Sequence, residues 1–267
     1  PPKLTPISQS VFKKINSEDF DVIISCGRKS VIPSIYLKKN SSKKVTNIHI
    51  QDPKVNLNNF SYVIAPEHDG LTGKNVYSTK GAMHYLTKQE IDNQNNYLED
   101  KLQSGKEYFL LILGGPTKHY DYSESNIMNI FNLYNDLITK NNLQGIIIPS
   151  MRTPKNTIDL AKNKLGEKNL VIDTVDKKAY LSALSLAKYI AVTCDSTSMI
   201  SEAALTGKPI YVADIPTKKN DQRIQKFKVL FHQLNITKKL DTKLETWDYE
   251  ILNETSRVAE EIKKQLI

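Results

Sequence analysis

The chain has 267 residues, enough for one large domain or two domains of common size, and we expect two. It carries 37 Lys and Arg against 29 Asp and Glu, but only four of the cations are Arg. Sequence-specific nucleic-acid binding relies on Arg forks, so this composition argues against a nucleic-acid partner. The lysines are scattered among many Asn residues, which suits a solvated surface, and the excess positive charge could also help the protein dock on an anionic membrane.

Cysteine usage and hydropathy indicate the compartment. Cys26 and Cys194 are the only cysteines and both end apolar segments, so we expect two buried thiols and no disulfide. No apolar run approaches the roughly 18 residues needed to cross a bilayer. We therefore expect a cytoplasmic protein that can also bind peripherally at the inner membrane face.

The first half of the chain alternates short β-branched segments with helical ones, which is typical of a parallel sheet covered by helices. Strands are predicted at 21–25, 45–50 and 62–65. A helix is predicted to follow the first strand as far as Lys39, and the polar segment 87–101 is also predicted to be helical. The segment 103–106 has the composition of a linker.

The second half repeats the same alternation. Strands are predicted at 108–113, 145–148, 170–172, 189–192 and 210–213, each followed by a helical segment. The tail has the apolar spacing of an amphipathic closing helix. The sequence thus predicts an α/β protein with two Rossmann-like domains: an N-terminal domain over 1–103, a C-terminal domain over 104–245 and a closing helix over 246–267.

The most informative segment runs from Val192 to Pro209 and predicts a strand, a hydroxyl-rich turn and a helix. Three hydroxyls fall where the helix would begin, at Ser196, Thr197 and Ser198. The free N–H groups and positive end of a helix favour an anion there, so we expect a phosphate site. Glu202 follows one turn later and could accept hydrogen bonds from a ribose diol. An ordinary helix cap is the competing interpretation.

Polar residues also follow the other strands of this half, where ligands of open parallel sheets bind. Paired glycines precede Thr117 and Lys118, so the backbone at Gly115 could approach a ligand closely while Lys118 offers a charge; a tight turn would explain the glycines equally well. Arg152 could grip a phosphate or carboxylate with two hydrogen bonds, or form a surface ion pair. Val175, after the third strand, could contact a base.

In the first half, His68 and Asp69 lie in one polar loop that follows a predicted strand. Histidine titrates near neutral pH and a neighbouring carboxylate can orient it, so these two residues are candidates for general base catalysis. A hydrogen-bonded structural loop is the alternative. The histidines and cysteines show no spacing typical of a metal site.

Taken together, several motifs resemble the mitochondrial fission Elm family, whose bacterial members are often described as nucleoside-diphosphate-sugar epimerases. The resemblance extends from about Asp21 to about Ala213. It rests on Gln51-Asp52-Pro53, Ala65-Pro66-Glu67-His68-Asp69-Gly70, Gly114-Gly115-Pro116-Thr117-Lys118-His119-Tyr120, Arg152-Thr153-Pro154 and Asp195-Ser196-x-Ser198-Met199-x-Ser201-Glu202-Ala203.

That family is in turn similar to the two-domain nucleotide-sugar glycosyltransferases with paired Rossmann-like halves, the GT-B class. The resemblance is strongest over 172–209 and implies a donor site. It implies that Ser196 to Ser198 meet the pyrophosphate, Glu202 the ribose, and Thr174 with Val175 the base. Gly115 and Lys118 would face the donor from the neighbouring loop. No catalytic base follows from the resemblance.

One departure from the family concerns the first half. Members usually carry a further βα unit before the segment that matches Asp21, and only about 20 residues precede it here. The N-terminal domain is therefore expected to be incomplete.

We hypothesise a metal-independent glycosyltransferase that binds a nucleotide-sugar as its substrate, uses no cofactor and transfers the sugar to an acceptor, which could be lipid-linked. A nucleoside-diphosphate-sugar epimerase would use the same donor site. A non-catalytic adaptor that has kept the fold is the alternative from another class.

Overall fold

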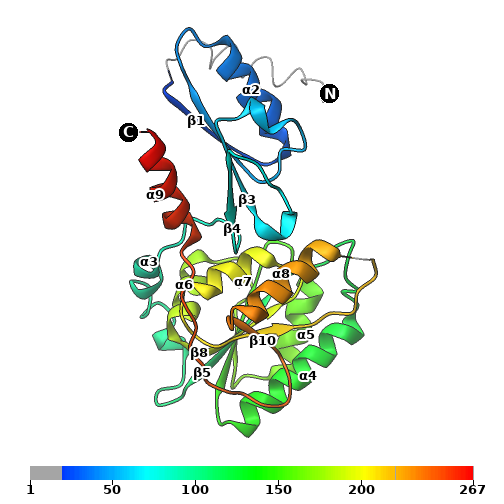
Figure 1. Cartoon of the computed structure of the whole chain (residues 1–267). Helices are drawn as coiled ribbons and strands as arrows, with labels where there is room; N and C mark the ends of the chain where they lie inside the picture. The colour runs from blue at the N-terminus through cyan, green and yellow to red at the C-terminus, as the bar shows by residue number, and fades with distance from the viewer. Residues whose placement is uncertain (1–19, 220, 267) are drawn as a thin grey trace. The chain divides into compact units, whose positions relative to one another are not determined.

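A computed structural model of the chain describes residues 20–219 and 221–266. Its contacts divide the chain into two compact units. Unit 1 comprises the residues up to Lys80 together with Glu254–Ile267, and unit 2 comprises Gly81–Asn253. Each unit contains one sheet whose strands are all parallel (Figure 1). The predicted α/β class with two parallel sheets is confirmed.

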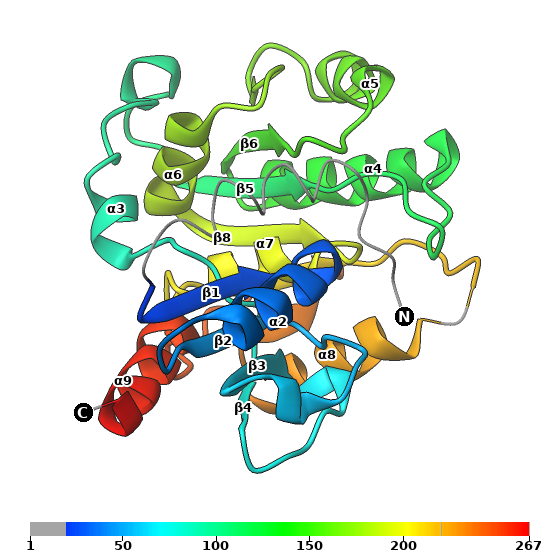
Figure 2. The ribbon, with the colours of Figure 1, turned by 90° about the horizontal axis from the view of Figure 1, so that it is seen from above.

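Unit 1 has a four-stranded sheet whose strands follow one another in sequence order. They are β1 (Val22–Cys26), β2 (Thr46–Ile50), β3 (Tyr62–Pro66) and β4 (Val76–Thr79). The helix α2 (Val31–Asn40) lies along β1 and β2 (Figure 2). Three short 3₁₀ turns complete the connections: η1 (Arg28–Ser30), η2 (Leu57–Asn59) and η3 (Glu67–Asp69).

The last helix, α9 (Glu254–Leu266), belongs to unit 1. Its apolar face is buried at Val258 and Ile262. Arg257 Nη2 donates to the Ser78 carbonyl at 2.6 Å, and Glu254 Oε2 accepts from the Lys80 amide at 2.7 Å. An amphipathic helix is therefore present over Glu254–Leu266, within the segment 246–267 expected from the sequence, and hydrogen bonds join it to β4 and to Lys80.

Unit 2 has a six-stranded sheet in the order β10-β9-β8-β5-β6-β7. Its strands are β5 (Tyr108–Leu113), β6 (Gln144–Pro149), β7 (Leu170–Val171), β8 (Ala187–Thr193), β9 (Ile210–Ala213) and β10 (Thr237–Lys239). Its helices are α3 (Lys88–Asp92), α4 (Glu124–Lys140), α5 (Lys155–Leu165), α6 (Lys177–Leu186), α7 (Thr197–Ala204) and α8 (Gln222–Gln233), with η4 (Glu99–Lys101) after α3. Counted within the unit, the strand order is 3-2-1-4-5-6, that of dinucleotide-binding Rossmann folds.

The core of unit 2 lies around β5, which pairs with both β6 and β8. Residues 109–113 are completely buried. Such a continuous apolar run is expected of a parallel strand covered on both faces. Figure 1 shows α6, α7 and α8 on one side of the sheet and α4 on the other.

The units differ from the expected domain boundaries at two points. Segment 81–103 was expected in the first domain but packs with unit 2: Leu98 is fully buried, and its amide donates to Ser182 Oγ at 3.1 Å. The closing helix joins unit 1. Cys194 is buried as expected, whereas Cys26 is exposed because it ends a strand at the sheet edge. The expected incompleteness concerns the chain before Asp21, and residues 1–19 lie outside the described part.

Candidate functional site

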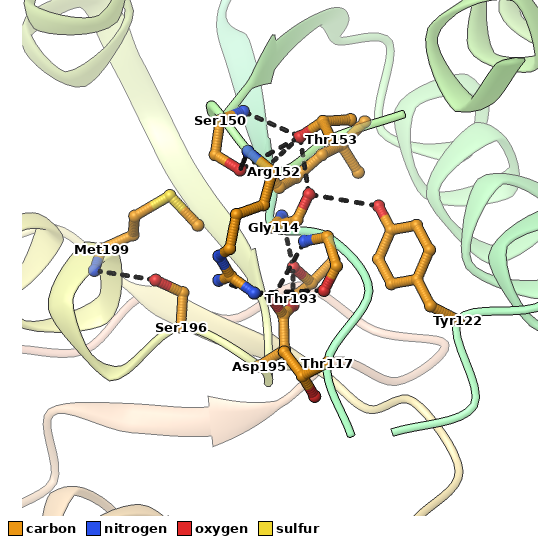
Figure 3. Close-up of polar contacts among 12 residues, drawn as sticks. Gly114, Thr117, Tyr122, Ser150, Arg152, Thr153, Thr193, Asp195, Ser196 and Met199 are labelled. Carbon is orange, nitrogen blue, oxygen red and sulfur yellow. Dashed lines mark hydrogen bonds and ion pairs between the residues drawn. The ribbon is translucent and has the colours of Figure 1, made fainter. Parts of the chain in front are cut away.

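The strand order of unit 2 creates a switch point between β5 and β8, where chain connections leave in opposite directions along the sheet. Open parallel sheets bind ligands outside the carboxyl ends of the strands at such a point. Polar groups of three loops meet there, after β5, β6 and β8 (Figure 3). The sequence predicted polar residues after these strands, and the fold brings them together.

Asp195 is the centre of this cluster. Its side chain is 0% exposed, and it accepts from Thr193 Oγ1 at 2.7 Å, the Gly115 amide at 3.0 Å and Arg152 Nη2 at 2.8 Å. Arg152 also donates through Nη1 to the Gly115 carbonyl at 3.2 Å. The guanidinium side chain nevertheless remains 42% exposed. Arg152 is thus fixed by a buried carboxylate while part of its charged surface faces solvent.

The paired glycines after β5 are required by the packing of the turn. A Cβ at Gly114 would lie 2.1 Å from Asp195 Oδ2, and one at Gly115 would lie 2.1 Å from the Arg152 carbonyl oxygen. Both amides donate inside the protein, Gly114 to Thr193 Oγ1 at 2.7 Å and Gly115 to Asp195. The tight-turn interpretation therefore explains both glycines. A contact between Gly115 and a ligand stays a prediction.

The helix α7 begins beside this cluster. Ser196 is its cap, and its Oγ accepts from the Met199 amide at 3.4 Å. Thr197 is partly exposed and Ser198 is exposed. The first-turn amides of a helix lack acceptors within the helix, and its N-terminal end carries partial positive charge. The ordinary cap is thus present, and it leaves the hydroxyls of Thr197 and Ser198 available to an anion.

A pocket of about 310 Å³ lies at the carboxyl ends of β5 and β6, between α6 and α7. It falls in the size range of small-molecule sites. Its lining consists of Tyr85, Ile112, Ile148, Pro149, Ser150, Met151, Val175, Asp176, Lys177, Tyr180, Met199 and Glu202. Three of these are exposed large hydrophobic residues, Tyr85, Met151 and Val175. A concave, mostly apolar site with a few polar groups is typical of ligand binding.

Glu202 is the carboxylate of this pocket. Its Oε2 accepts from the Tyr180 hydroxyl at 2.7 Å. Burial raises the pKa of Glu202 above its ordinary value, while the hydrogen bond from Tyr180 and the charge of His84 act in the opposite direction. The carboxylate is therefore held by a neutral phenol, and its acceptor capacity is not exhausted.

The family model described as mitochondrial fission ELM1 matches residues 2–266. The chain belongs to this family. Among curated proteins, RP120 of Rickettsia prowazekii is 28% identical over 284 residues, covering 91% of this chain and 79% of that protein. The mitochondrial fission protein ELM1 of Arabidopsis thaliana is 25% identical over 275 residues, covering 92% of this chain. The chain spans 64% of the Arabidopsis protein, slightly less than two thirds.

Solved structures give the fold of this ELM1-family chain. The UDP-GlcNAc 2-epimerase of Methanocaldococcus jannaschii matches with a TM-score of 0.56 at 15% identity, over 98% of this chain and 84% of that one. The enzyme of Neisseria meningitidis, solved with UDP-GlcNAc, matches with a TM-score of 0.56 at 15% identity, over 96% and 80%. The predicted GT-B-like architecture is thus confirmed.

The remaining predicted donor residues of the ELM1-family chain lie at the same edge of the sheet but differ in exposure. Lys118 and Thr174 are exposed, and Thr117 Oγ1 accepts from the His119 amide at 3.2 Å, which stabilises the loop after β5. Val175 lines the pocket and Thr174 does not. Of the two residues predicted to contact the nucleobase, only Val175 therefore lies at the pocket.

His68 and Asp69 form the turn η3 in unit 1. Their side chains are 2% and 7% exposed, and His68 Nε2 lies 3.8 Å from Asp69 Oδ1. The two residues are neighbours as expected, in a buried setting. Their catalytic role stays a prediction.

Sequence reasoning missed three residues of the site. Asp195 lies within the Elm motif, but nothing in the sequence shows that its partners are Thr193 and Arg152. Tyr180 was missed because only the packing of α6 against the sheet brings it to Glu202. Met151, 90% exposed at the pocket, follows a strand without any distinctive pattern.

Within residues 20–219 and 221–266, no three His, Cys, Asp or Glu side chains are placed to hold a metal ion. Over the same ranges, none of the helices combines the length and apolar character needed to cross a membrane.

Proposed function

We propose that unit 2 binds a nucleoside-diphosphate sugar at the carboxyl edge of its sheet and that the protein uses it as a sugar donor. The observation that carries this proposal is the pocket shared by Val175 and Glu202, next to the start of α7 and the half-exposed Arg152. An apolar wall, a carboxylate and a cationic end are what a base, a ribose and a diphosphate require.

Each part of the donor has a proposed partner. The base would lie against Val175 and Thr174, and the ribose hydroxyls would donate to Glu202. The diphosphate would contact Arg152 and the first turn of α7 at Ser196, Thr197 and Ser198, with Gly115, Thr117 and Lys118 on the adjoining loop as further predicted contacts. A fixed guanidinium and a helix end stabilise charge that develops on a leaving diphosphate, because they need no reorganisation.

The acceptor side of the reaction is proposed on chemistry alone. His68 or Asp69 would remove the proton of the acceptor hydroxyl. A lipid-linked acceptor is consistent with the formal charge of +8, since cationic surfaces are attracted to anionic membranes.

An epimerase is the second candidate, because the two solved structures described above are UDP-GlcNAc 2-epimerases. An epimerase would convert the nucleotide-sugar without any acceptor, whereas a transferase would release the nucleoside diphosphate only when an acceptor is present. A non-catalytic adaptor is favoured by the name of the Arabidopsis relative, a mitochondrial fission protein. An adaptor of this kind would bind no nucleotide at all.

A thermal-shift panel of nucleoside diphosphates and their sugars tests the proposal. A ligand present at a hundred times its Kd stabilises the native state by about 2.7 kcal/mol, so at least one compound should raise the Tm by several degrees. Glu202→Ala should lose the shift while staying folded. Glu260→Ala, which removes an exposed carboxylate of α9, is the matched control and should keep the shift.

The proposal is overturned if no compound shifts the wild-type protein, or if Glu202→Ala binds as well as the control variant. Product analysis with and without added acceptors then separates transferase from epimerase.

A further inference from the structure

Tyr180 and Glu202 form a pair that joins two helices inside the pocket. Tyr180 lies on α6 and Glu202 on α7, and the phenol oxygen donates to Oε2 at 2.7 Å. Both side chains line the pocket. A carboxylate whose one oxygen is engaged by a fixed donor presents the other oxygen in a defined orientation.

Several titratable groups surround the Tyr180–Glu202 pair. The titratable groups that act on Glu202 or line the pocket beside it are Tyr180, His84, Tyr85, Asp176 and Lys177. The ammonium group of Lys177 lies 4.7 Å from the centre of the Tyr85 ring and 3.8 Å from a carboxylate oxygen of Glu90, so it interacts with both of these side chains. Burial and the neighbouring carboxylate of Glu202 raise the pKa of Tyr180 well above its ordinary value, so the phenol stays protonated and remains a donor at neutral pH.

We propose that Tyr180 is a positioning residue that, by occupying Oε2 of Glu202, directs the free oxygen of the carboxylate to a ribose diol and makes the site selective for ribonucleotides over 2′-deoxyribonucleotides. This inference rests on the proposed function and deepens it by naming the substrate class. Removing one ribose hydroxyl removes one of the donors to this half-buried carboxylate, which costs roughly tenfold in affinity.

The pair also determines how binding depends on pH. Only the ionised carboxylate accepts from both ribose hydroxyls, and burial raises the pKa of Glu202 above 4.5. Ribose selectivity is therefore lost on acidification, and this loss occurs at a higher pH than the titration of an ordinary glutamate would give. The hydrogen bond from Tyr180 stabilises the ionised form, so removing the phenol oxygen moves that loss to a higher pH.

The experiment measures the Kd of the best nucleoside diphosphate from the panel and of its 2′-deoxy analogue by calorimetry between pH 5 and pH 8. The full-length wild type is compared with Tyr180→Phe, Glu202→Gln and Tyr108→Phe. The last variant removes a phenol that donates to the Gln103 carbonyl at 3.1 Å, outside the pocket, and serves as the matched control.

The wild type and the control should prefer the ribonucleotide about tenfold at pH 8. Tyr180→Phe should lose most of this preference and shift its acid limb to higher pH. Glu202→Gln should show no preference at any pH, and any pH dependence that remains in this variant belongs to groups other than Glu202.

Three outcomes overturn the inference while leaving the proposed function intact. Tyr180→Phe could weaken both ligands equally with an unchanged pH profile, as a structural role alone would require. It could also bind as the wild type does. If Tyr180→Phe does not fold, the wild-type profile still decides, because selectivity that stays unchanged from pH 8 down to the lowest pH at which the protein remains folded contradicts the role of the ionised pair. Absence of any nucleotide binding by the wild type instead removes the proposed function itself.

Discussion

Asp195 is a carboxylate that the protein encloses completely and supplies with three donors. A buried ion needs such partners because its desolvation otherwise costs several kcal/mol. Two of the donors are the Gly115 amide and the Thr193 hydroxyl, and the third is the guanidinium of Arg152. The carboxylate thus orders the loops after β5 and β6 as well as its own.

We expect Asp195→Ala to lower the free energy of unfolding by about 3 kcal/mol, because three donors lose their acceptor in a site closed to water. Urea denaturation of the full chain measures this. Asp173→Asn is the control: it removes one carboxylate of an exposed ion pair with Lys162, at 3.0 Å, and should change stability little. Equal stability of the two variants would contradict the structural role of Asp195.

At the residue scale, the sequence identified candidate site residues but not the groups that they contact. Arg152 was recognised as a candidate phosphate ligand or ion-pair member, and the structure shows the ion pair. Gly115 was expected either at a ligand or in a tight turn, and steric contacts with Arg152 account for the turn. Partners of this kind come from strands that are far apart in sequence, so no local pattern reveals Thr193 beside Gly114 or Tyr180 beside Glu202.

At the scale of elements, the end of α6 depends on a residue from a later loop. Lys208 Nζ donates to the Leu184 carbonyl at 2.8 Å and to the Ser185 carbonyl. These belong to the last turn of α6, whose carbonyls have no partner within the helix. Burial lowers the pKa of Lys208 to about 8. The Lys208 amine thus caps the C-terminal end of α6, although its buried environment disfavours its positive charge.

We expect Lys208→Met to lower the free energy of unfolding by about 1–2 kcal/mol at pH 7, because two carbonyls lose a donor.

The pH dependence of the free energy of unfolding should change as well. The pKa of Lys208 is lower in the folded state than its ordinary 10.5, so the unfolded state binds more protons between about pH 8 and 10.5. The stabilisation by Lys208 is therefore smallest below about pH 8 and increases with pH across that window.

Urea denaturation at several pH values, wild type against Lys208→Met, isolates this term because other titrations cancel in the difference. A difference in stability that stays constant from pH 8 to 10.5 would contradict the environment described for the amine.

The strands were predictable because parallel strands buried on both faces are continuous apolar runs, as at 108–113 and 145–148. Other elements gave weaker patterns. β4 (Val76–Thr79) contains Tyr77 and Ser78 and resembles a polar loop, and β10 (Thr237–Lys239) is two-thirds lysine. The helix expected at 87–101 is α-helical only over Lys88–Asp92, followed by turns and the 3₁₀ helix η4, because its polar residues offer no continuous apolar face.

At the scale of the whole molecule, the two units divide the proposed roles. All proposed donor contacts lie within Gly81–Asn253, which is continuous in sequence, whereas His68 and Asp69 belong to unit 1. The expected boundary at 103 would have cut through the packing of Leu98 against unit 2, because composition marks a linker at 103–106 but cannot show that Gln103 donates to Gln144 at 2.8 Å.

We expect the fragment 81–253 to fold and to bind the nucleoside diphosphate of the full chain with a Kd within about threefold, since its sheet and core are its own. Circular dichroism and calorimetry test this. A fragment starting at 104 should fold poorly, because it lacks Leu98 and the hydrogen bonds of that segment to Ser182. Equal stability of the two fragments would contradict the assignment of 81–103 to unit 2.

A co-crystal structure of the full chain with the nucleoside diphosphate that gives the largest thermal shift examines the proposed donor site most directly. We predict a base against Val175, a ribose hydroxyl within hydrogen-bond distance of Glu202, and phosphate oxygens at Arg152 and the first turn of α7. A ligand bound elsewhere, with Glu202 still contacting only Tyr180 and the start of α7 unoccupied, would contradict the donor site and the function proposed from it.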